Sequence, residues 1–213
     1  MPVPVKICGI RNRPVLDGAV EGGAAAVGFV FAGGSPREVS PEHAARLAPH
    51  VPPAVLKVGL FVDAGDEAID AAVKACGLDV LQLHGKETPE RAAGVRRRFG
   101  CEVWKALPIA ERADVSAAFA FEKAVDRLLF DSRPPAGARL PGGNAVAFDW
   151  SLLAPPLPKL PWLLSGGLTA VNLEEAVRVS GARMVDVSSG VERSRGVKDP
   201  ELVRAFLEKA AAL

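Results

Sequence analysis

The chain has 213 residues, of which 49% are hydrophobic and 24% charged, a composition typical of a globular protein rather than a disordered one. Its 26 Lys and Arg residues nearly balance 25 Asp and Glu residues, for a formal net charge of +1. This balance argues against a nucleic-acid or anionic-membrane partner, since such partners usually require a basic face.

Targeting and membrane signals are not found in the sequence. No apolar stretch approaches the roughly 20 residues needed to cross a bilayer, and residues 1–6 lack the basic and apolar regions of a secretory signal. The three cysteines, Cys8, Cys76 and Cys101, are odd in number and far apart, which favours a reducing compartment over a disulfide scaffold. We therefore expect a soluble, cytoplasmic protein.

Short apolar runs recur along the whole chain, each followed by a loop and then by a stretch rich in Ala, Glu, Arg and Leu. The runs mostly do not alternate with polar residues, as expected of parallel strands that are buried on both faces. In chain order they cover residues 3–8, 26–32, 55–62, 80–84, 103–107, 128–131, 160–165 and 184–188. Each run is predicted to be one strand.

Helix boundaries are marked between these runs. A capping oxygen precedes a proline at the first helical position in three places, Ser40-Pro41, Thr88-Pro89 and Asp199-Pro200. Gly77 and Gly181 are placed where helices should end. Residues 133–148 are rich in Pro, Gly and Ala, which predicts a long loop, followed by a short helix near Trp150.

Eight strand–helix units in a chain of 213 residues predict a closed (β/α)8 barrel, the TIM-barrel fold of the α/β class. A doubly wound open sheet is the alternative, but it usually has about five to seven strands and would leave one unit over. The sequence has no linker and no break in composition, so we expect residues 1–213 to form a single domain.

Glycine-rich loops follow the last two predicted strands, at Gly166-Gly167 and at Ser188-Ser189-Gly190. Glycine lets backbone N–H groups approach a ligand closely, and these two loops are where barrels commonly bind phosphate. The alternative is that the glycines only form tight turns. Their presence in both loops favours a phosphate site at Gly166, Gly167, Ser189 and Gly190.

Other strand ends carry reactive or charged side chains. The Cys8 thiol could act as a base or nucleophile if its surroundings lower its pKa, although a free cysteine is commonly a small buried apolar residue. Asp131 closes an apolar run, where a carboxyl group serves either as a general acid or as a hydrogen-bond acceptor. Arg37 could pair a substrate carboxylate, although a loop arginine is usually only solvated. His84 has no partners at metal-ligand spacing, so no metal site is predicted.

A set of motifs runs through nearly the whole chain in a fixed order: residues 5–10, 28–31, 35–37, 58–62, 81–85, 148–150, 164–168 and 185–192. Together these motifs resemble those of the phosphoribosylanthranilate isomerase family, cytoplasmic enzymes of tryptophan biosynthesis. The first motif (VKICGI) and the last (VDVSSGVE) are the most specific among phosphate-binding barrels.

The resemblance implies an Amadori rearrangement of N-(5'-phosphoribosyl)anthranilate, without cofactor or metal. Cys8 would be the general base, Asp131 the general acid, and Arg37 the ligand of the anthranilate carboxylate. Asp186 and His84 match family positions with a substrate-orienting role, and the two glycine loops would hold the phosphate. The expected partner is this small-molecule substrate, and the protein would be a monomer or a homodimer.

One segment departs from the family pattern. Gly142-Gly143-Asn144-Ala145 stands where family members usually have Gly-Gly-Thr/Ser-Gly. Ala145 has a Cβ and does not freely adopt positive φ, so we expect a changed loop over the substrate and a changed turnover rate. The reactive side chains themselves are intact.

Three other functions are compatible with a barrel of this kind. A histidine-pathway sugar isomerase would carry aspartates at the ends of strands one and five, where this chain has Cys8 and Leu107-Pro108. Indoleglycerol-phosphate synthase would need a catalytic Lys and Glu inside the barrel; Lys6 and Lys105 lie on strands one and five, but Lys6 belongs to the first motif above and Lys105 precedes the end of its strand. A non-catalytic phosphosugar-binding barrel would have no reason to retain both Cys8 and Asp131, so their presence favours the enzyme.

Overall fold

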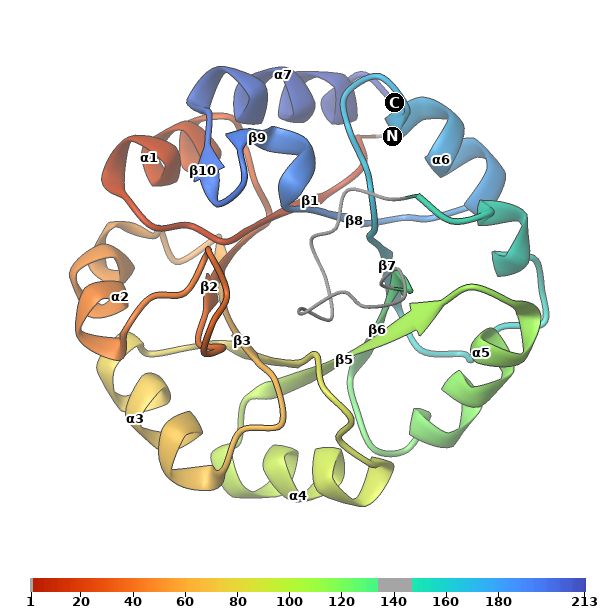
Figure 1. The fold of residues 1–213 in the computed structure, drawn as a ribbon, viewed down its shortest axis with the longest axis horizontal. Coiled ribbons are helices and arrows are strands. Elements are labelled where there is room, and N and C mark those ends of the chain that lie inside the picture. Colours follow the sequence, from red (N-terminus) through yellow and green to blue (C-terminus); the bar gives the residue numbers. More distant parts are fainter. Residues whose placement is uncertain (1, 134–146) are drawn as a thin grey trace.

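The computed structural model describes residues 2–133 and 147–213, and its central feature is a closed barrel of parallel strands surrounded by helices (Figure 1). Neighbours in sequence are neighbours in the barrel, and β8 pairs with β1 to close it. The strands are β1 (Val5–Cys8), β2 (Ala26–Val30), β3 (Leu56–Phe61), β4 (Val80–Leu83), β5 (Glu102–Ile109), β6 (Arg127–Ser132), β7 (Trp162–Leu164) and β8 (Val185–Val187). Every predicted run contains or overlaps one of them, so the predicted (β/α)8 barrel is confirmed.

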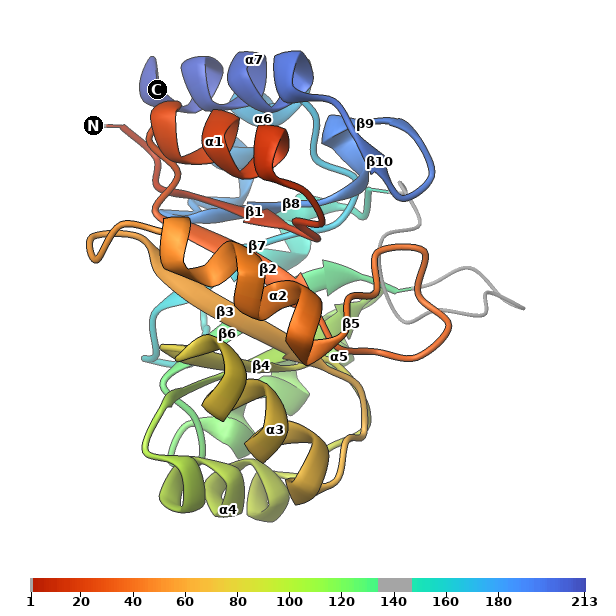
Figure 2. The ribbon, with the colours of Figure 1, turned by 90° about the vertical axis from the view of Figure 1, so that its left-hand side faces the viewer.

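Helices lie on the outside of the barrel, as Figures 1 and 2 show. They are α1 (Arg13–Glu21), α2 (Pro41–Leu47), α3 (Asp66–Cys76), α4 (Pro89–Phe99), α5 (Arg112–Ala117), α6 (Leu173–Ser180) and α7 (Pro200–Ala211). In the described part of the chain, 3-10 turns accompany them: η1 (Ala48–His50), η2 (Ala118–Phe121), η3 (Trp150–Leu153) and η4 (Ser189–Val191). Within residues 2–133 and 147–213, no helix has the length and apolarity that a membrane span requires.

The predicted helix boundaries are confirmed. The side chains of Ser40, Thr88 and Asp199 each accept a hydrogen bond from the backbone of the first turn that follows. Gly77 and Gly181 end α3 and α6 in the left-handed conformation.

The short helix expected near Trp150 is η3. The segment Gly142-Gly143-Asn144-Ala145, for which a changed loop was predicted, lies outside the described residues.

Alternation along the strands separates an outer core from the barrel interior. Strand residues such as Ile7 and Phe61 pack with helix residues such as Leu16 and Ile69 in the outer core. A second cluster draws only on the strands and the residues next to them, so it fills the barrel interior, and we call it the apolar layer: Ala26, Val58, Val80, Trp104, Ala106, Leu129, Leu163 and Met184. The barrel is therefore packed through its centre, as is usual for this fold.

A short antiparallel hairpin, β9 (Glu192–Ser194) and β10 (Val197–Lys198), follows η4 and was not predicted. Figure 2 shows it at the same end of the barrel as the long loop after β2. Arg11 joins the two, since its Nη1 donates to Pro36 O at 2.8 Å and to Gly196 O at 3.4 Å. The hairpin thus becomes part of the wall at this end of the barrel.

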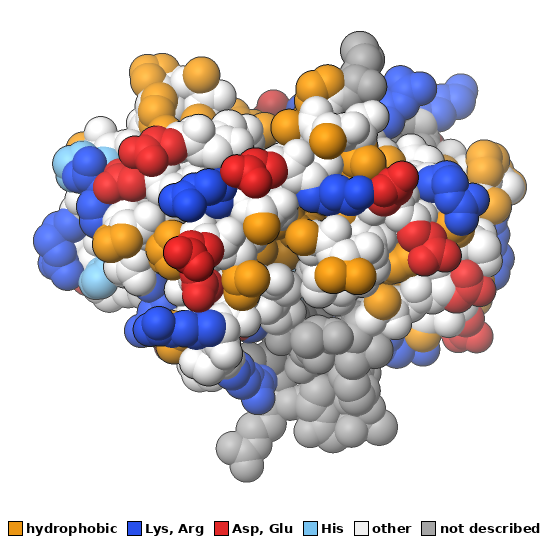
Figure 3. Space-filling view, turned by 90° about the horizontal axis from the view of Figure 1, so that it is seen from above, with side chains coloured by type: hydrophobic (Ala, Val, Ile, Leu, Met, Phe, Trp, Pro, Cys, Tyr) orange, Lys and Arg blue, Asp and Glu red, His pale blue; other side chains and the backbone are white. Residues whose placement is uncertain are grey.

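The outer face over α7 and its neighbouring helices carries interspersed acidic and basic side chains (Figure 3). No patch of a single sign dominates this face. The mixture is what the near-neutral sum of charges predicts for this side of the molecule.

Candidate active site

A cavity of about 220 Å³ opens where the strands end at their C-terminal side. All the residues predicted for the site line it: Cys8, Arg37, His84, Asp131, Gly166, Gly167, Asp186, Ser189 and Gly190. They come from the ends of six different strands or the loops that follow them. The structure therefore brings the predicted residues together at one mouth of the barrel.

A set of polar side chains occupies the barrel interior next to this cavity, and we call it the polar layer: Lys6, Gln82, Asp131, Ser165 and Asp186. All of them are buried. Their neighbours along each strand pack outward against the helices, so strand alternation turns these side chains inward. Lys6, Gln82 and Ser165 were not predicted as site residues, although a polar residue inside a short buried strand is a signal that sequence can provide.

Cys8 ends β1, beside Gly28 of the neighbouring strand β2. A Cβ added at Gly28 would lie 3.1 Å from Cys8 Sγ and 3.3 Å from Lys6 Cε, so the missing side chain makes room for both groups. Burial raises the pKa of the Cys8 thiol, while the positive charge of Lys6 opposes that rise. The hypothesis drawn from the sequence required surroundings that lower the pKa of the Cys8 thiol. In the structure the pKa is raised instead, because the effect of burial is larger than that of the nearby cation.

A buried ion pair lies close to Cys8. Lys6 Nζ is 2.7 Å from Asp186 Oδ1, and Ser165 Oγ donates to Asp186 Oδ2 at 3.1 Å. Burial by itself lowers the pKa of Lys6, but Asp186 and Cys8 together raise it above its ordinary value. Lys6 is therefore held as a cation beside the thiol, where it favours the thiolate form.

Asp131 faces the same cavity from β6 and is held through both carboxyl oxygens. Its Oδ1 accepts a hydrogen bond from Ser132 N at 2.8 Å, and its Oδ2 lies 3.2 Å from His84 Nε2. His84 Nδ1 in turn lies 3.0 Å from Gln82 Nε2. The orientation of the Asp131 carboxyl group thus depends on His84, which follows β4, and His84 in turn contacts Gln82 of β4.

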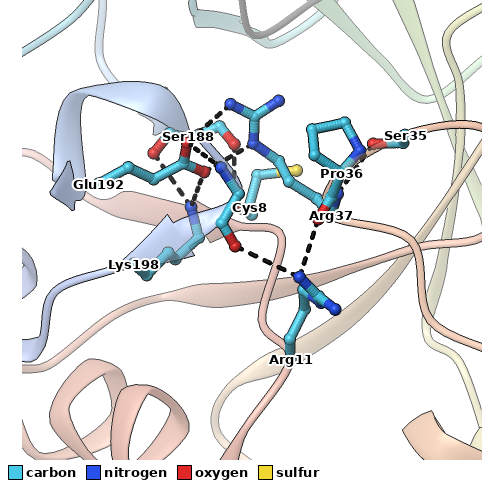
Figure 4. Close-up of polar contacts among 9 residues, drawn as sticks. Cys8, Arg11, Ser35, Pro36, Arg37, Ser188, Glu192 and Lys198 are labelled. Carbon is cyan, nitrogen blue, oxygen red and sulfur yellow. Dashed lines mark hydrogen bonds and ion pairs between the residues drawn. The ribbon is translucent and has the colours of Figure 1, made fainter. Parts of the chain in front are cut away.

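Arg37 is buried, with only 4% of its surface exposed, and is not the solvated loop arginine that the sequence left open. Its Nε and Nη2 contact Glu192 Oε1 and Oε2 at 2.6 and 2.9 Å. Lys198 Nζ donates to Ser188 O at 3.0 Å and lies 3.4 Å from Glu192 Oε1. Figure 4 shows Arg37 and Lys198 both reaching Glu192, close to Cys8. Glu192 and Lys198 belong to the hairpin and could not be placed here from sequence.

Charge at this cluster is uneven, because two cations face one carboxylate. Burial by itself raises the pKa of the Glu192 carboxyl, but Arg37 and Lys198 hold it below its ordinary value. Burial lowers the pKa of Lys198, although Glu192 opposes the shift. With all three groups ionised, the cluster has a net positive charge, which suits an anionic ligand.

The glycines of the last two loops have conformational reasons to be glycine. Gly166 and Gly167 have φ of +89° and +64°. A Cβ at Gly190 would lie 1.7 Å from the carbonyl oxygen of Leu168, so the two loops touch at this residue. Turn geometry and packing therefore account for these glycines without a ligand.

A separate observation, in the loop that follows β7, supports the binding of an anionic ligand. The backbone N–H groups of Gly166 and Gly167 donate to no acceptor among the described residues, and both residues line the cavity. Asn172 fixes this loop, since its Nδ2 donates to Gly167 O at 3.0 Å and its Oδ1 accepts from Thr169 N at 2.8 Å. In the part of the chain that the structure describes, no group of three or more His, Cys, Asp or Glu residues is arranged to hold a metal ion.

A closed (β/α)8 barrel whose C-terminal mouth is lined by charged and reactive side chains defines a barrel enzyme with its active site in the usual place. Comparison with known proteins narrows this class. The family model of N-(5'phosphoribosyl)anthranilate (PRA) isomerase matches residues 5–209. The chain is 56% identical over 214 residues to the N-(5'-phosphoribosyl)anthranilate isomerase of Rhodospirillum centenum, covering 100% of both chains.

Solved structures agree with this assignment. The phosphoribosyl anthranilate isomerase of Thermotoga maritima superposes with a TM-score of 0.89 at 37% identity, over 99% of this chain and 100% of that one. A second isomerase structure, in complex with reduced 1-(o-carboxyphenylamino)-1-deoxyribulose 5-phosphate, has a TM-score of 0.86 at 36% identity, over 99% and 100%. The chain belongs to the PRA isomerase family, and is an isomerase of tryptophan biosynthesis.

Proposed function

We propose that the protein converts N-(5'-phosphoribosyl)anthranilate to 1-(2-carboxyphenylamino)-1-deoxyribulose 5-phosphate by a cofactor-free Amadori rearrangement. The names of the relatives and the ligand of one solved neighbour support this choice of substrate. The main structural support for the proposed reaction is that a thiol, Cys8 of β1, and a carboxyl group, Asp131 of β6, line the same cavity. These two strands are not adjacent in the barrel. A base and an acid so placed can act on the two sides of one sugar.

The reaction needs one acid and one base. Asp131 protonates the furanose ring oxygen as the ring opens to an imine, and is left as a carboxylate. Cys8, as the thiolate, then removes the proton from sugar C2, giving an enol-amine that tautomerises to the ketone. No atom is gained or lost, so the step is an isomerisation. Lys6, fixed by Asp186, stabilises the thiolate that this step requires.

Two anionic ends of the substrate match two parts of the cavity. The phosphate lies at Gly166, Gly167, Ser189 and Gly190, and anion binding there is supported by the N–H groups of Gly166 and Gly167, which have no acceptor among the described residues. Since the phosphate does not react, its binding energy holds the sugar in the reactive geometry.

The anthranilate carboxylate binds at Arg37, whose side chain lines the cavity and whose Nε–Nη2 edge is held by Glu192. His84 and Asp186 line the same cavity and orient the substrate.

A fluorescence assay that follows the loss of phosphoribosylanthranilate with purified protein tests the proposal. The wild-type protein should convert the substrate, and Cys8→Ser should lose about 10²-fold or more in kcat. Cys101→Ser is the matched control, because this half-buried thiol lies outside the cavity and should leave kcat unchanged. Wild-type protein that binds the reduced product analogue without turning over the substrate would be a phosphosugar-binding barrel, and the proposal would be wrong.

A further inference from the structure

Gln82 is an amide in the middle of a buried strand, and packing does not require it. It is fully buried on β4, with apolar residues on both sides of it in the strand. Its Nε2 contacts His84, whereas its Oε1 has no hydrogen-bond partner among the described residues. Leaving one end of a buried amide unpaired destabilises the fold, so an apolar residue of similar size would serve the core better. The amide therefore points to a role in the neighbouring site.

The contact with Gln82 determines where the proton of His84 lies. An amide nitrogen donates hydrogen bonds and has no lone pair with which to accept one. With the amide oriented as it is in the structure, His84 Nδ1 is the acceptor at 3.0 Å, which leaves the proton of a neutral ring on Nε2. Nε2 lies 3.2 Å from Asp131 Oδ2, so the protonated side of the ring faces the carboxyl group at contact distance.

We propose that Gln82 is a positioning residue for the general acid, acting through His84. The inference rests on the proposed function, in which Asp131 gives its proton to the sugar ring oxygen. The carboxylate that remains is then stabilised by the Ser132 N–H, which donates to Oδ1, and by the protonated Nε2 of His84, which lies 3.2 Å from Oδ2. Gln82 keeps the proton on Nε2, because without Gln82 the ring can carry its proton on Nδ1 and turn a lone pair toward Asp131.

The tautomer can be measured on the wild-type protein. Long-range ¹H–¹⁵N correlation spectra of the imidazole rings should show an unprotonated Nδ1 and a protonated Nε2 for His84. The chain has three histidines, so the spectrum is simple. His50 is exposed, and His43 contacts Arg11 O and Arg46 through its two ring nitrogens, so both serve as internal references. A protonated Nδ1 on neutral His84 in the wild type would overturn the proposal.

Kinetics of matched variants test the role itself. Gln82→Leu keeps the size of the side chain and should lower kcat roughly tenfold, with KM changed less than about twofold. In the same variant the His84 ring should show both tautomers. Met184→Leu, a size-conserving change in the apolar layer, is the control and should leave kcat and the His84 signals unchanged.

A double-mutant cycle separates positioning through His84 from a general effect on the barrel. In a His84→Ala background, adding Gln82→Leu should cause no further loss of kcat, since the residue through which Gln82 acts is gone. If the two fold-changes multiply instead, Gln82 acts independently and the proposal is wrong. Wild-type turnover is measured first: an inactive wild type contradicts the proposed function, whereas an active wild type with an unaffected Gln82→Leu contradicts only this inference.

Discussion

The same strands build two interior layers of opposite character. The apolar layer is made of Ala, Val, Leu, Met and Trp side chains, and the polar layer contains a lysine, a glutamine, a serine and two aspartates. Both are buried, so exposure does not distinguish them. The distinction is the position along each strand, because Leu129 belongs to the apolar layer and Asp131, two residues later and on the same face, borders the cavity.

The energetics of the two layers differ accordingly. Apolar burial stabilises the fold in proportion to the area removed from water. A buried ion pair such as Lys6–Asp186 contributes little net stability, because desolvation offsets the attraction between the charges. Polar groups retained inside the barrel are therefore better explained by chemistry than by stability. Changes in one layer should affect unfolding, and changes in the other should affect turnover.

The largest expected effect lies in the apolar layer. Leu129→Ala should lower the free energy of unfolding by about 2–5 kcal/mol, because Leu129 is fully buried and its loss leaves a cavity. Urea denaturation measures this change. At a temperature where the variant is fully folded, its kcat should stay within about twofold of wild type. A variant that stays as stable as wild type but loses turnover would remove the contrast between the layers.

Asp131→Asn should have the converse effect. The amide cannot donate the required proton, so kcat should fall by about 10²-fold or more. The midpoint of thermal unfolding should change little, since Asn keeps the size and can still accept from Ser132 N. Steady-state kinetics and a thermal melt on the same preparation provide both readings. Unchanged kcat would exclude Asp131 as the general acid.

The pH dependence of thiol ionisation tests the surroundings of Cys8. Only the thiolate is a base, and burial raises the pKa of Cys8 above its ordinary value, so the basic form increases as pH rises. Below that pKa, the thiolate fraction should rise about tenfold per pH unit, for instance from pH 7 to pH 8. The difference in ultraviolet thiolate absorbance between wild type and Cys8→Ser measures it. A thiol that is already fully ionised below pH 7 would contradict the raised pKa.

A smaller effect is expected at the boundary between the layers. Gly28→Ala should lower kcat several-fold, because the new Cβ would lie 3.1 Å from Cys8 Sγ and 3.3 Å from Lys6 Cε, which then have to shift. Gly94→Ala on α4 is the matched control, since a Cβ there meets nothing within 4 Å. It should raise the unfolding free energy by about 0.5–1 kcal/mol and leave kcat unchanged. Equal kinetics of the two variants would argue against close packing at the thiol.

The barrel could be predicted from sequence because each strand is a short apolar run between helix signals. Cys8 and Asp131 could be predicted to lie near one another because residues at the ends of parallel strands meet at the same edge of a barrel. Their partners could not. Arg37 and Glu192 are 155 positions apart, and their contact depends on a hairpin of two very short strands whose formation no local pattern indicates. The raised pKa of Cys8 was also beyond reach, because it depends on the depth of burial in the assembled barrel.

Glu192 has a mechanical consequence beyond its charge. One carboxylate binds the loop after β2, through Arg37, and the end of the hairpin that follows β8, through Lys198. The loop proposed to bind the aromatic acid is therefore tied to the hairpin that follows the last strand of the barrel. Replacing Arg37 to alter specificity would leave Glu192 facing Lys198 alone, so we expect compensating changes to be needed in two segments that are remote in the gene.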